Sequence, residues 1–314
     1  MRLSRLHVEK EAHEDGIWAA AWSANDVLLT GSVDESVMLW TEEEDSLQRV
    51  HTFMGHNLGV ISLTSHAKGM YAATSSLDSM IRVWDIEDRQ TTLQILEMPP
   101  SECWCIDFCP AADRMLLSVA GGAAENVSLW DVQGDARQVN SMKLPKKEAP
   151  DSKQHNRPQF VLSTVFSPDA RKVAACGMDG LVAIFDVETG KLVGQMSDHN
   201  KPVRTMAFTQ DSRMLLSGSD DMHIHMYDSH NASLVEAMSG HEAWVLSLSC
   251  HPDGAHVASG GSDSKVKLWE LSSRRAIQTV NEHSDQVWGV EFRKDGTRLA
   301  SVSDDGSVAI HACG

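Results

Sequence analysis

Residues 257–270 read VASGGSDSKVKLWE, and variants of this stretch return along the chain at a nearly fixed spacing. Each variant has an apolar run, a turn that contains an aspartate, and a second apolar run. A fixed period of roughly 20 to 50 residues indicates a repeat architecture, so the repeat decides the fold. The aspartates are Asp34, Asp78, Asp179, Asp221, Asp263 and Asp305, and the last four lie 42 residues apart.

A second marker runs in step with the first, because a histidine precedes five of these aspartates by 21 or 22 residues. A seventh, degenerate copy covers residues 115–131, where Trp130 sets the alignment and Ala124 takes the place of the aspartate. Two independent markers in register exclude a chance pattern. The histidines are His13, His56, His199, His241 and His283.

Each copy contains four short β-type runs separated by turn residues, such as WVLSLSC, HVASGG, KVKLWE and AIQTV within residues 244–280. Helical periodicity is absent over any useful length. Four antiparallel strands in about 40 residues predict one blade of a β-propeller. With its Gly-His and Trp-Asp punctuation, the sequence resembles the WD-repeat family. Seven copies predict an all-β, seven-bladed propeller that spans residues 1–314 as one domain.

The ends of the chain are expected to close the ring. The last copy stops after its third strand, at SVAIHACG, and residues 3–9 (LSRLHVE) have the composition of the missing fourth strand. Pairing these two segments would remove open sheet edges. A polar stretch with three prolines, about residues 139–159, is expected to form a flexible loop between the third and fourth blades.

Composition narrows the class of protein. The 44 acidic and 27 basic residues give a net charge of −17, which opposes contact with phosphate backbones, so no direct nucleic-acid binding is expected. No apolar run is long enough to span a membrane, and the N-terminal stretch lacks the pattern of a secretory signal. The six cysteines form no CxxC pair and are expected to be reduced thiols. These features predict a protein of the nucleus and cytoplasm, with no membrane partner.

The recurring polar residues have a structural interpretation. In the WD-repeat family, a histidine, a Ser or Thr, the turn aspartate and a Trp form a hydrogen-bonded tetrad inside the blade. The resemblance implies three complete tetrads: His13, Thr30, Asp34 and Trp40; His56, Thr74, Asp78 and Trp84; and His241, Ser259, Asp263 and Trp269.

The other four copies depart from this pattern. A Ser, His and Asp also form the triad of many hydrolases, but five copies at one period indicate a scaffold, so we expect no enzymatic activity. The fifth copy has Tyr227 with His199, Ser217 and Asp221; the seventh has His311 with His283, Ser301 and Asp305; the fourth keeps Asp179 but has Arg157, Ala175 and Phe185; the third keeps only Trp130.

One histidine group raises the question of a metal. His223 and His225 share a strand face, with His230 nearby. No carboxylate or thiolate at a fixed spacing completes a coordination shell, so a solvated or interblade histidine pair is the favoured interpretation over a weak metal site. No cofactor is predicted.

The candidate binding surface is the mouth of the central channel. The fifth residue after each of the five histidine markers is the first variable position of an innermost strand. Aligning Phe108 and Phe166 with Phe208 gives the same position in the third and fourth copies, and three of the seven residues are tryptophans. Each tryptophan either packs between blades or belongs to an exposed aromatic patch that anchors a peptide. The seven positions are Trp18, Ile61, Trp104, Leu162, Arg204, Leu246 and Trp288, and the predicted partner-binding residues are Trp18, Trp104, Phe160, Arg204, Trp244 and Trp288.

Segments outside the repeat consensus narrow the resemblance. AHEDGIWAAAW, SGHEAWVLSL, HSDQVWGVEFR and HNKPVRTMAF resemble the WD-repeat subunit of the superkiller complex, which also belongs to the RNA-polymerase-associated factor (PAF) complex. MPPSECWCIDF, VAGGAAENVSLWD and RLASVSDDGSVAIH are most similar to the plant members of this group. The resemblance implies a scaffold in mRNA decay and in transcription elongation with histone modification. Its implied partners are the superkiller helicase, the tetratricopeptide scaffold and PAF subunits.

The same resemblance implies a ligand for the channel mouth. Members of the group accept a short motif with a glutamine–arginine pair and a following aromatic or aliphatic residue. The tryptophans would form the apolar pocket, and acidic side chains would face the arginine. These acidic residues are Glu14, Asp15, Glu102, Asp285 and Asp304.

Two other functions remain open. A substrate receptor of a cullin-type ubiquitin ligase usually carries WDxR after the third strand, and the tetrapeptides here are WDIE, WDVQ, FDVE, YDSH and WELS. A G-protein β-type subunit would need an N-terminal coiled coil, and twelve residues precede His13. Outside its complexes the protein is expected to be a monomer.

Overall fold

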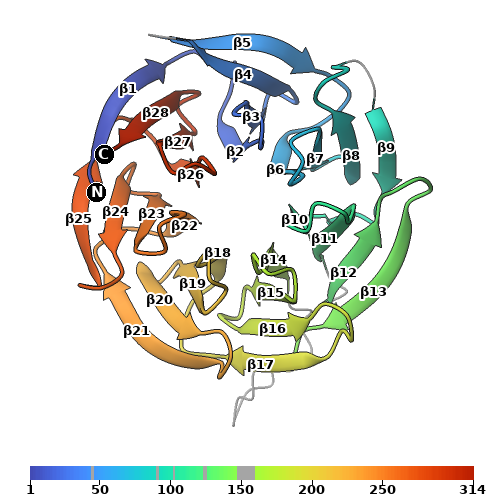
Figure 1. Cartoon of the computed structure of the whole chain (residues 1–314), viewed down its shortest axis with the longest axis vertical. Helices are drawn as coiled ribbons and strands as arrows, with labels where there is room; N and C mark the ends of the chain where they lie inside the picture. Colours follow the sequence, from blue (N-terminus) through green and yellow to red (C-terminus); the bar gives the residue numbers. More distant parts are fainter. Residues whose placement is uncertain (44–45, 90–91, 102, 123–125, 147–159) are drawn as a thin grey trace.

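The chain folds into seven antiparallel sheets of four strands each, arranged as a ring around a central channel (Figure 1). The computed structural model describes residues 1–314 except 44–45, 90–91, 102, 123–125 and 147–159. No helix occurs among the described residues, so none of them forms a membrane-spanning helix. The seven-bladed, all-β propeller expected from the sequence is confirmed.

The first three blades follow chain order from the channel outward. Blade 1 consists of β2 (Ile17–Trp22), β3 (Leu28–Ser32), β4 (Val37–Glu43) and β5 (Ser46–Phe53). Blade 2 consists of β6 (Val60–Ser65), β7 (Tyr71–Ser76), β8 (Met80–Asp85) and β9 (Thr92–Glu97). Blade 3 consists of β10 (Cys105–Phe108), β11 (Leu116–Gly121), β12 (Asn126–Asp131) and β13 (Arg137–Lys143).

Blades 4 to 6 repeat this order, and blade 7 takes its outer strand from the other end of the chain. Blade 4 has β14 (Val161–Phe166), β15 (Lys172–Gly177), β16 (Val182–Asp186) and β17 (Leu192–Met196). Blade 5 has β18 (Val203–Phe208), β19 (Met214–Ser219), β20 (His223–Asp228) and β21 (Ser233–Ser239). Blade 6 has β22 (Val245–Cys250), β23 (His256–Gly261), β24 (Val266–Glu270) and β25 (Arg275–Val280). Blade 7 has β26 (Val287–Phe292), β27 (Arg298–Ser303), β28 (Val308–Cys313) and β1 (Leu3–Glu9).

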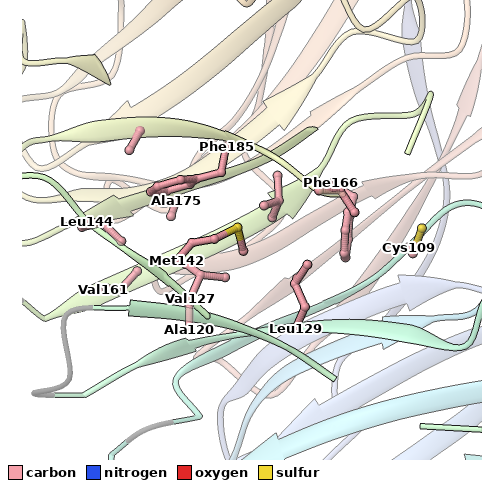
Figure 2. Close-up of a cluster of buried hydrophobic side chains, with 13 residues drawn as sticks. Cys109, Ala120, Val127, Leu129, Met142, Leu144, Val161, Phe166, Ala175 and Phe185 are labelled. Carbon is pink, nitrogen blue, oxygen red and sulfur yellow. The ribbon is translucent and has the colours of Figure 1, made fainter. Parts of the chain in front are cut away.

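The core lies between neighbouring blades, because each sheet packs face to face on the next. Figure 2 shows the core between blades 3 and 4, where Val127, Leu129 and Met142 face Phe166 and Phe185. All five side chains are buried. Apolar packing therefore joins these two blades even though both lack a complete tetrad.

The second strand of a blade is rich in small residues because both of its faces are covered. In β23 every residue after His256 is buried. A Cβ added to Gly260 would lie 2.7 Å from the side chain of Val287 in the next blade. The small residues of the repeat thus set how closely adjacent blades approach.

Residues 3–9 complete the last blade, as expected. Strand β1 pairs antiparallel with β28, and Leu3 lies opposite Cys313. Ion pairs join this last blade to blade 1: Glu42 lies 2.7 Å from Arg298 Nε and 3.5 Å from Arg293 Nη1. The ring is closed by backbone pairing and by charge.

The expected loop at residues 139–159 is wrong at its start. Residues 139–143 belong to β13, where Met142 is buried opposite Val127. The alternation that buries Met142 and exposes Val139 is that of an outer strand, and this overrides the polar composition. Residues 147–159, including Arg157, lie outside the described part of the chain.

Candidate functional site

One pocket of about 410 Å³ opens at the mouth of the central channel. Its wall is formed by the residues that begin the innermost strands, one from each blade. The ring positions chosen from the sequence therefore lie together in space. They are Trp18, Ile61, Trp104, Leu162, Arg204, Leu246 and Trp288.

The ring tryptophans differ in exposure from the tetrad tryptophans. Trp18, Trp104 and Trp288 are partly exposed, whereas Trp40, Trp84 and Trp269 are buried. Packing between blades thus explains the positions of the tetrad tryptophans but not those of the ring tryptophans. A partly exposed aromatic wall in a concave pocket is the kind of surface on which peptide anchors bind.

Trp18 and Trp288 are held as a pair across the closing seam. Their ring centroids lie 5.5 Å apart, and their indole N–H groups donate to the two oxygens of Asp304, at 2.7 and 2.8 Å. A Cβ added to Gly16 would lie 2.5 Å from the Asp304 carboxylate, so the glycine leaves room for it. Asp304, expected to face a partner's arginine, instead has each oxygen bonded to an indole.

Trp104 and Phe160 form the aromatic wall on the other side of the mouth. Their rings meet edge to face with centroids 5.4 Å apart, at the starts of β10 and β14. Phe160 is partly exposed but lies outside the pocket lining. It therefore supports Trp104 from beside the pocket.

Arg204 is not a free cation. Its guanidinium makes a bidentate pair with the buried carboxylate of Asp220, with an Nη2–Oδ2 distance of 2.9 Å, and stacks 4.7 Å from the ring centroid of Trp244. Trp244 is 43% exposed and, like Phe160, lies beside the pocket rather than in its wall. Asp220 was missed from the sequence because the neighbouring Asp221 carries the repeat signature.

The pocket lining also includes a carboxyl group, that of Glu291 on β26. Burial raises the pKa of Glu291 to about 8, and the nearby Asp107 adds to this effect while Lys294 opposes it. Burial likewise raises the pKa of Asp107 to about 7, although its oxygens accept hydrogen bonds from the Phe166 N–H and the Thr64 hydroxyl. Neither acid was predicted as a site residue. Both could have been recognised because they occupy an inner-strand position that holds Ala, Val, Ser or Thr in the other blades.

The remaining acidic residues expected at the rim are placed as follows. Glu14, Asp15 and Asp285 are exposed in the loops before β2 and β26. Glu102 lies outside the described residues. These exposed carboxylates complement a basic partner.

The three complete tetrads are hydrogen-bonded inside their blades. In blade 1, Trp40 donates to Thr30 Oγ1 at 2.8 Å, Thr30 lies 2.7 Å from His13 Nε2, and His13 Nδ1 lies 2.9 Å from Asp34. In blade 2 the distances are 2.8 Å for Trp84–Thr74, 2.8 Å for Thr74–His56 and 3.1 Å for His56–Asp78. In blade 6 they are 2.8 Å for Trp269–Ser259, 2.6 Å for Ser259–His241 and 3.0 Å for His241–Asp263.

Blades 5 and 7 keep parts of the network. His199 binds Ser217 at 2.8 Å and Asp221 at 2.7 Å. His283 binds Ser301 at 2.8 Å, but Ser307 inserts between its Nδ1 and Asp305. In both blades these bonds connect the loop before the first strand to the second strand, which is a structural role.

The remaining predicted positions lie in blades 3 and 4. Trp130 donates to Ser128, and Asp179 accepts from the Leu181 N–H. Ala175 and Phe185 are buried. Ala124 lies outside the described residues.

Among the described residues, one group of side chains has metal-ligand spacing: His199, Asp221 and His225. The rings of His199 and His225 are stacked face to face, with centroids 3.7 Å apart and planes within 9°. A metal bound to imidazole nitrogen lies in the plane of the ring, so two stacked rings cannot share one ion in this geometry. His225 Nδ1 instead lies 3.0 Å from the Tyr227 hydroxyl.

Comparison with known proteins agrees with this architecture. The family model of the WD domain, G-beta repeat, matches residues 4–41, 47–85, 232–270 and 274–311, and a model of the nucleolar protein 10-like N-terminal domain matches residues 94–242. The chain is 45% identical over 212 residues to WD repeat-containing protein VIP3 of Arabidopsis thaliana, which covers 66% of this chain and 64% of VIP3. The expected likeness to a plant WD-repeat protein is confirmed.

Two further relatives extend the comparison. WD repeat-containing protein SL1-17 of Schistosoma mansoni is 34% identical over 205 residues, which cover 64% of this chain and 62% of that protein. Superkiller complex protein 8 of Dictyostelium discoideum is 31% identical over 106 residues, which cover 33% and 35%. The matched segment spans just under two thirds of the length of VIP3 and of SL1-17.

Proposed function

We propose that this chain, a seven-bladed β-propeller with WD40 repeats, is a non-catalytic adaptor that binds short partner segments at the mouth of its channel. The observation that supports this is the joint lining of one pocket by seven equivalent positions, three of them partly exposed tryptophans. The repeated His, Ser or Thr and Asp residues are committed to bonds inside the blades. The adaptor role therefore uses the wall of the pocket and not these polar sets.

We further propose membership of two assemblies, a superkiller complex and a PAF complex, with a location in both cytoplasm and nucleus. The names of two relatives support the type of protein: one is a superkiller complex protein and the other the plant WD-repeat protein VIP3. The partners would be the superkiller helicase, the tetratricopeptide scaffold and PAF subunits. In these assemblies the propeller would contribute binding and not chemistry.

The pocket chemistry supports a partner segment with one apolar and one basic side chain. The partner's apolar side chain would enter between the Trp18–Trp288 pair and Trp104, where apolar area is exposed in a concave site. The basic side chain would face Glu291 or the rim acids. Arg204 is neutralised by Asp220 and would not repel it.

Affinity purification from the native cell, followed by mass spectrometry, tests this function. A double variant, Trp104→Ala with Trp288→Ala, is expected to lose the partners, because each anchor contributes on the order of 2–4 kcal/mol to such an interface. A matched control is Ile277→Ala, since Ile277 is an exposed apolar residue on outer strand β25.

The outcomes separate the alternatives. A folded double variant that still recovers its partners would move binding to the side or the opposite face of the propeller. Recovery of cullin-ligase subunits, in place of helicase, tetratricopeptide or elongation partners, would support the substrate-receptor alternative and contradict the assemblies proposed above.

A further inference from the structure

Blade 1 contains a second crevice, of about 720 Å³, between the loop that precedes β2 and the end of β5. It lies on the outer part of the blade, and no residue of its lining belongs to the channel-mouth pocket. Carboxylates, two methionines and a threonine hydroxyl border it. The residues used below are Glu11, Glu14, Asp34, Met38, Thr52 and Met54.

The other two blades with complete tetrads fill the equivalent place with a cation. In blade 6, Lys267 lies opposite Thr279 in the strand register, is 8% exposed, and donates from its ammonium to the Thr279 hydroxyl at 3.0 Å. In blade 2, the equivalent residue is Arg82, whose guanidinium donates to the Gly55 carbonyl at 2.7 Å. Gly55 directly precedes the tetrad histidine of its blade.

Blade 1 keeps these surroundings but has a methionine at the strand position of the cation. Met38 occupies the position of Lys267, and it lies opposite Thr52, just as Lys267 lies opposite Thr279. Ala12 precedes the tetrad histidine as Gly55 does, and it also lines the crevice. The crevice therefore borders Met38 and Thr52, the positions at which blade 6 carries Lys267 and Thr279.

The charges around the crevice favour a cation. Burial raises the pKa of Asp34, but hydrogen bonds from His13 and Ser36 outweigh this and hold the pKa well below its usual range, so the group is ionised. Glu11 and Glu14 are exposed carboxylates at the edge. One cation, Arg49, lies nearby, and its described contact in the crevice is with the sulfur of Met38 at 3.9 Å. Three carboxylates against one guanidinium leave the crevice negative.

We propose that this crevice binds a lysine side chain presented by a partner protein. The ammonium would lie near the Thr52 hydroxyl and the carboxylates, as that of Lys267 lies near Thr279 in blade 6. The methylene stem would pack along Met38, which is buried, and Met54, which is 65% exposed. This site is separate from the channel mouth and does not depend on the function proposed above.

Methionine-methyl NMR of the intact protein tests the site, with N-acetyl-lysine methylamide and hexalysine as probes and N-acetyl-norleucine methylamide as the uncharged control. We expect saturable shifts of the Met38 and Met54 methyl signals with both lysine probes and none with norleucine. Met178 and Met222 are exposed on other blades and serve as internal controls.

Two substitutions make the test specific. Met38→Lys supplies the cation within the chain, so it should preserve the melting temperature and reduce the shift of Met54 at least tenfold. Thr52→Val removes the hydroxyl and should weaken binding several-fold without unfolding the blade. Trp288→Ala should leave lysine binding unchanged.

The proposal is overturned if Met54 does not respond to the probes in the wild-type protein. It is also overturned if Met38→Lys binds them as the wild type does, or if Met178 and Met222 shift as much as Met54. The last result would mean that lysine is attracted only to the acidic surface as a whole.

Discussion

The indole N–H groups of Trp18 and Trp288 donate to opposite oxygens of a single carboxylate, Asp304. Trp18 is the second residue of β2 in blade 1 and Trp288 the second residue of β26 in blade 7, so the carboxylate links the two blades where the ring closes. Two bonds to one charged acceptor fix both rings in place before any partner arrives. Such preorganisation reduces the entropy lost on binding.

Replacing Asp304 with Asn should therefore weaken partner binding by about 1–2 kcal/mol, the cost of leaving one indole without its charged acceptor. The amide keeps the shape but presents an N–H₂ group to one of the two rings. Binding is measured by calorimetry with a recovered partner segment, and the pose of the rings by tryptophan fluorescence. Asp135→Asn, which changes an exposed carboxylate between β12 and β13 and outside the pocket lining, is the control. Equal binding by both variants would mean that the hydrogen bonds from the two indoles to Asp304 do not contribute to partner binding.

Replacing Asp263 with Ala should destabilise the fold by several kcal/mol. The carboxylate lies 3.0 Å from His241 and also accepts the backbone N–H groups of Glu242 and Lys265. Its loss leaves the buried end of a network without its charged acceptor. Thermal unfolding measures the effect, and Asp228→Ala, which removes a turn carboxylate at the surface, should cost far less. A similar loss for both would contradict the tetrad's structural role.

The stability of blade 5 should fall in acid because His225 is held neutral. Burial lowers the pKa of His225 to about 4, the adjacent His199 lowers it further, and Asp221 and Asp198 oppose the effect. The unfolded side chain titrates near pH ~6.5. Since the unfolded state binds the proton first, stability declines as the pH falls from about 6.5 to about 4. His311, whose pKa is also lowered to about 4 by burial, acts in the same direction.

His225→Phe should keep the stacked ring and remove one titrating group. Melting temperatures at pH 7 and pH 5 should therefore differ less for this variant than for the wild type. His230→Gln, at an exposed histidine of the same blade, should leave the difference unchanged. If the melting temperature of His225→Phe falls as much between pH 7 and pH 5 as that of the wild type, groups other than His225 cause the acid sensitivity.

The period of the sequence predicted the ring positions because equivalent residues of a repeat occupy equivalent heights in the propeller. Counting five residues from a histidine marker selected Trp18 and Trp288, and aligning Phe108 with Phe208 selected Trp104. All three line one pocket. The contacts that fix these rings were beyond this reasoning. The hydrogen bond from the Trp18 indole to Asp304 joins residues near opposite ends of the chain, and it depends on how closely the closing blades approach.

Comparison between the blades also contains signals that a consensus hides. Met38 and Lys267 occupy the same repeat position, and only their difference indicates the crevice of blade 1. Glu291 and Asp107 likewise stand out only against the small residues of the other inner strands. Aligning the repeats identifies the residues that they share, whereas these sites lie at positions where one repeat differs from the others.

Glu291 provides a pH test of the channel-mouth pocket. Because burial raises its pKa to about 8, the carboxyl group is mostly protonated at pH 7 in the free protein. A basic partner side chain near it would favour the ionised form, so binding would release a proton. Affinity for the partner segment should therefore rise with pH between about 7 and 8.5 and level off above the pKa of the free group.

Glu291→Gln should bind with little pH dependence in this range, as measured by calorimetry in two buffers of different ionisation enthalpy. The control Glu242→Gln alters an exposed carboxylate outside the pocket and should keep the wild-type profile. A flat profile for the wild type would place the basic side chain at the rim, away from the channel.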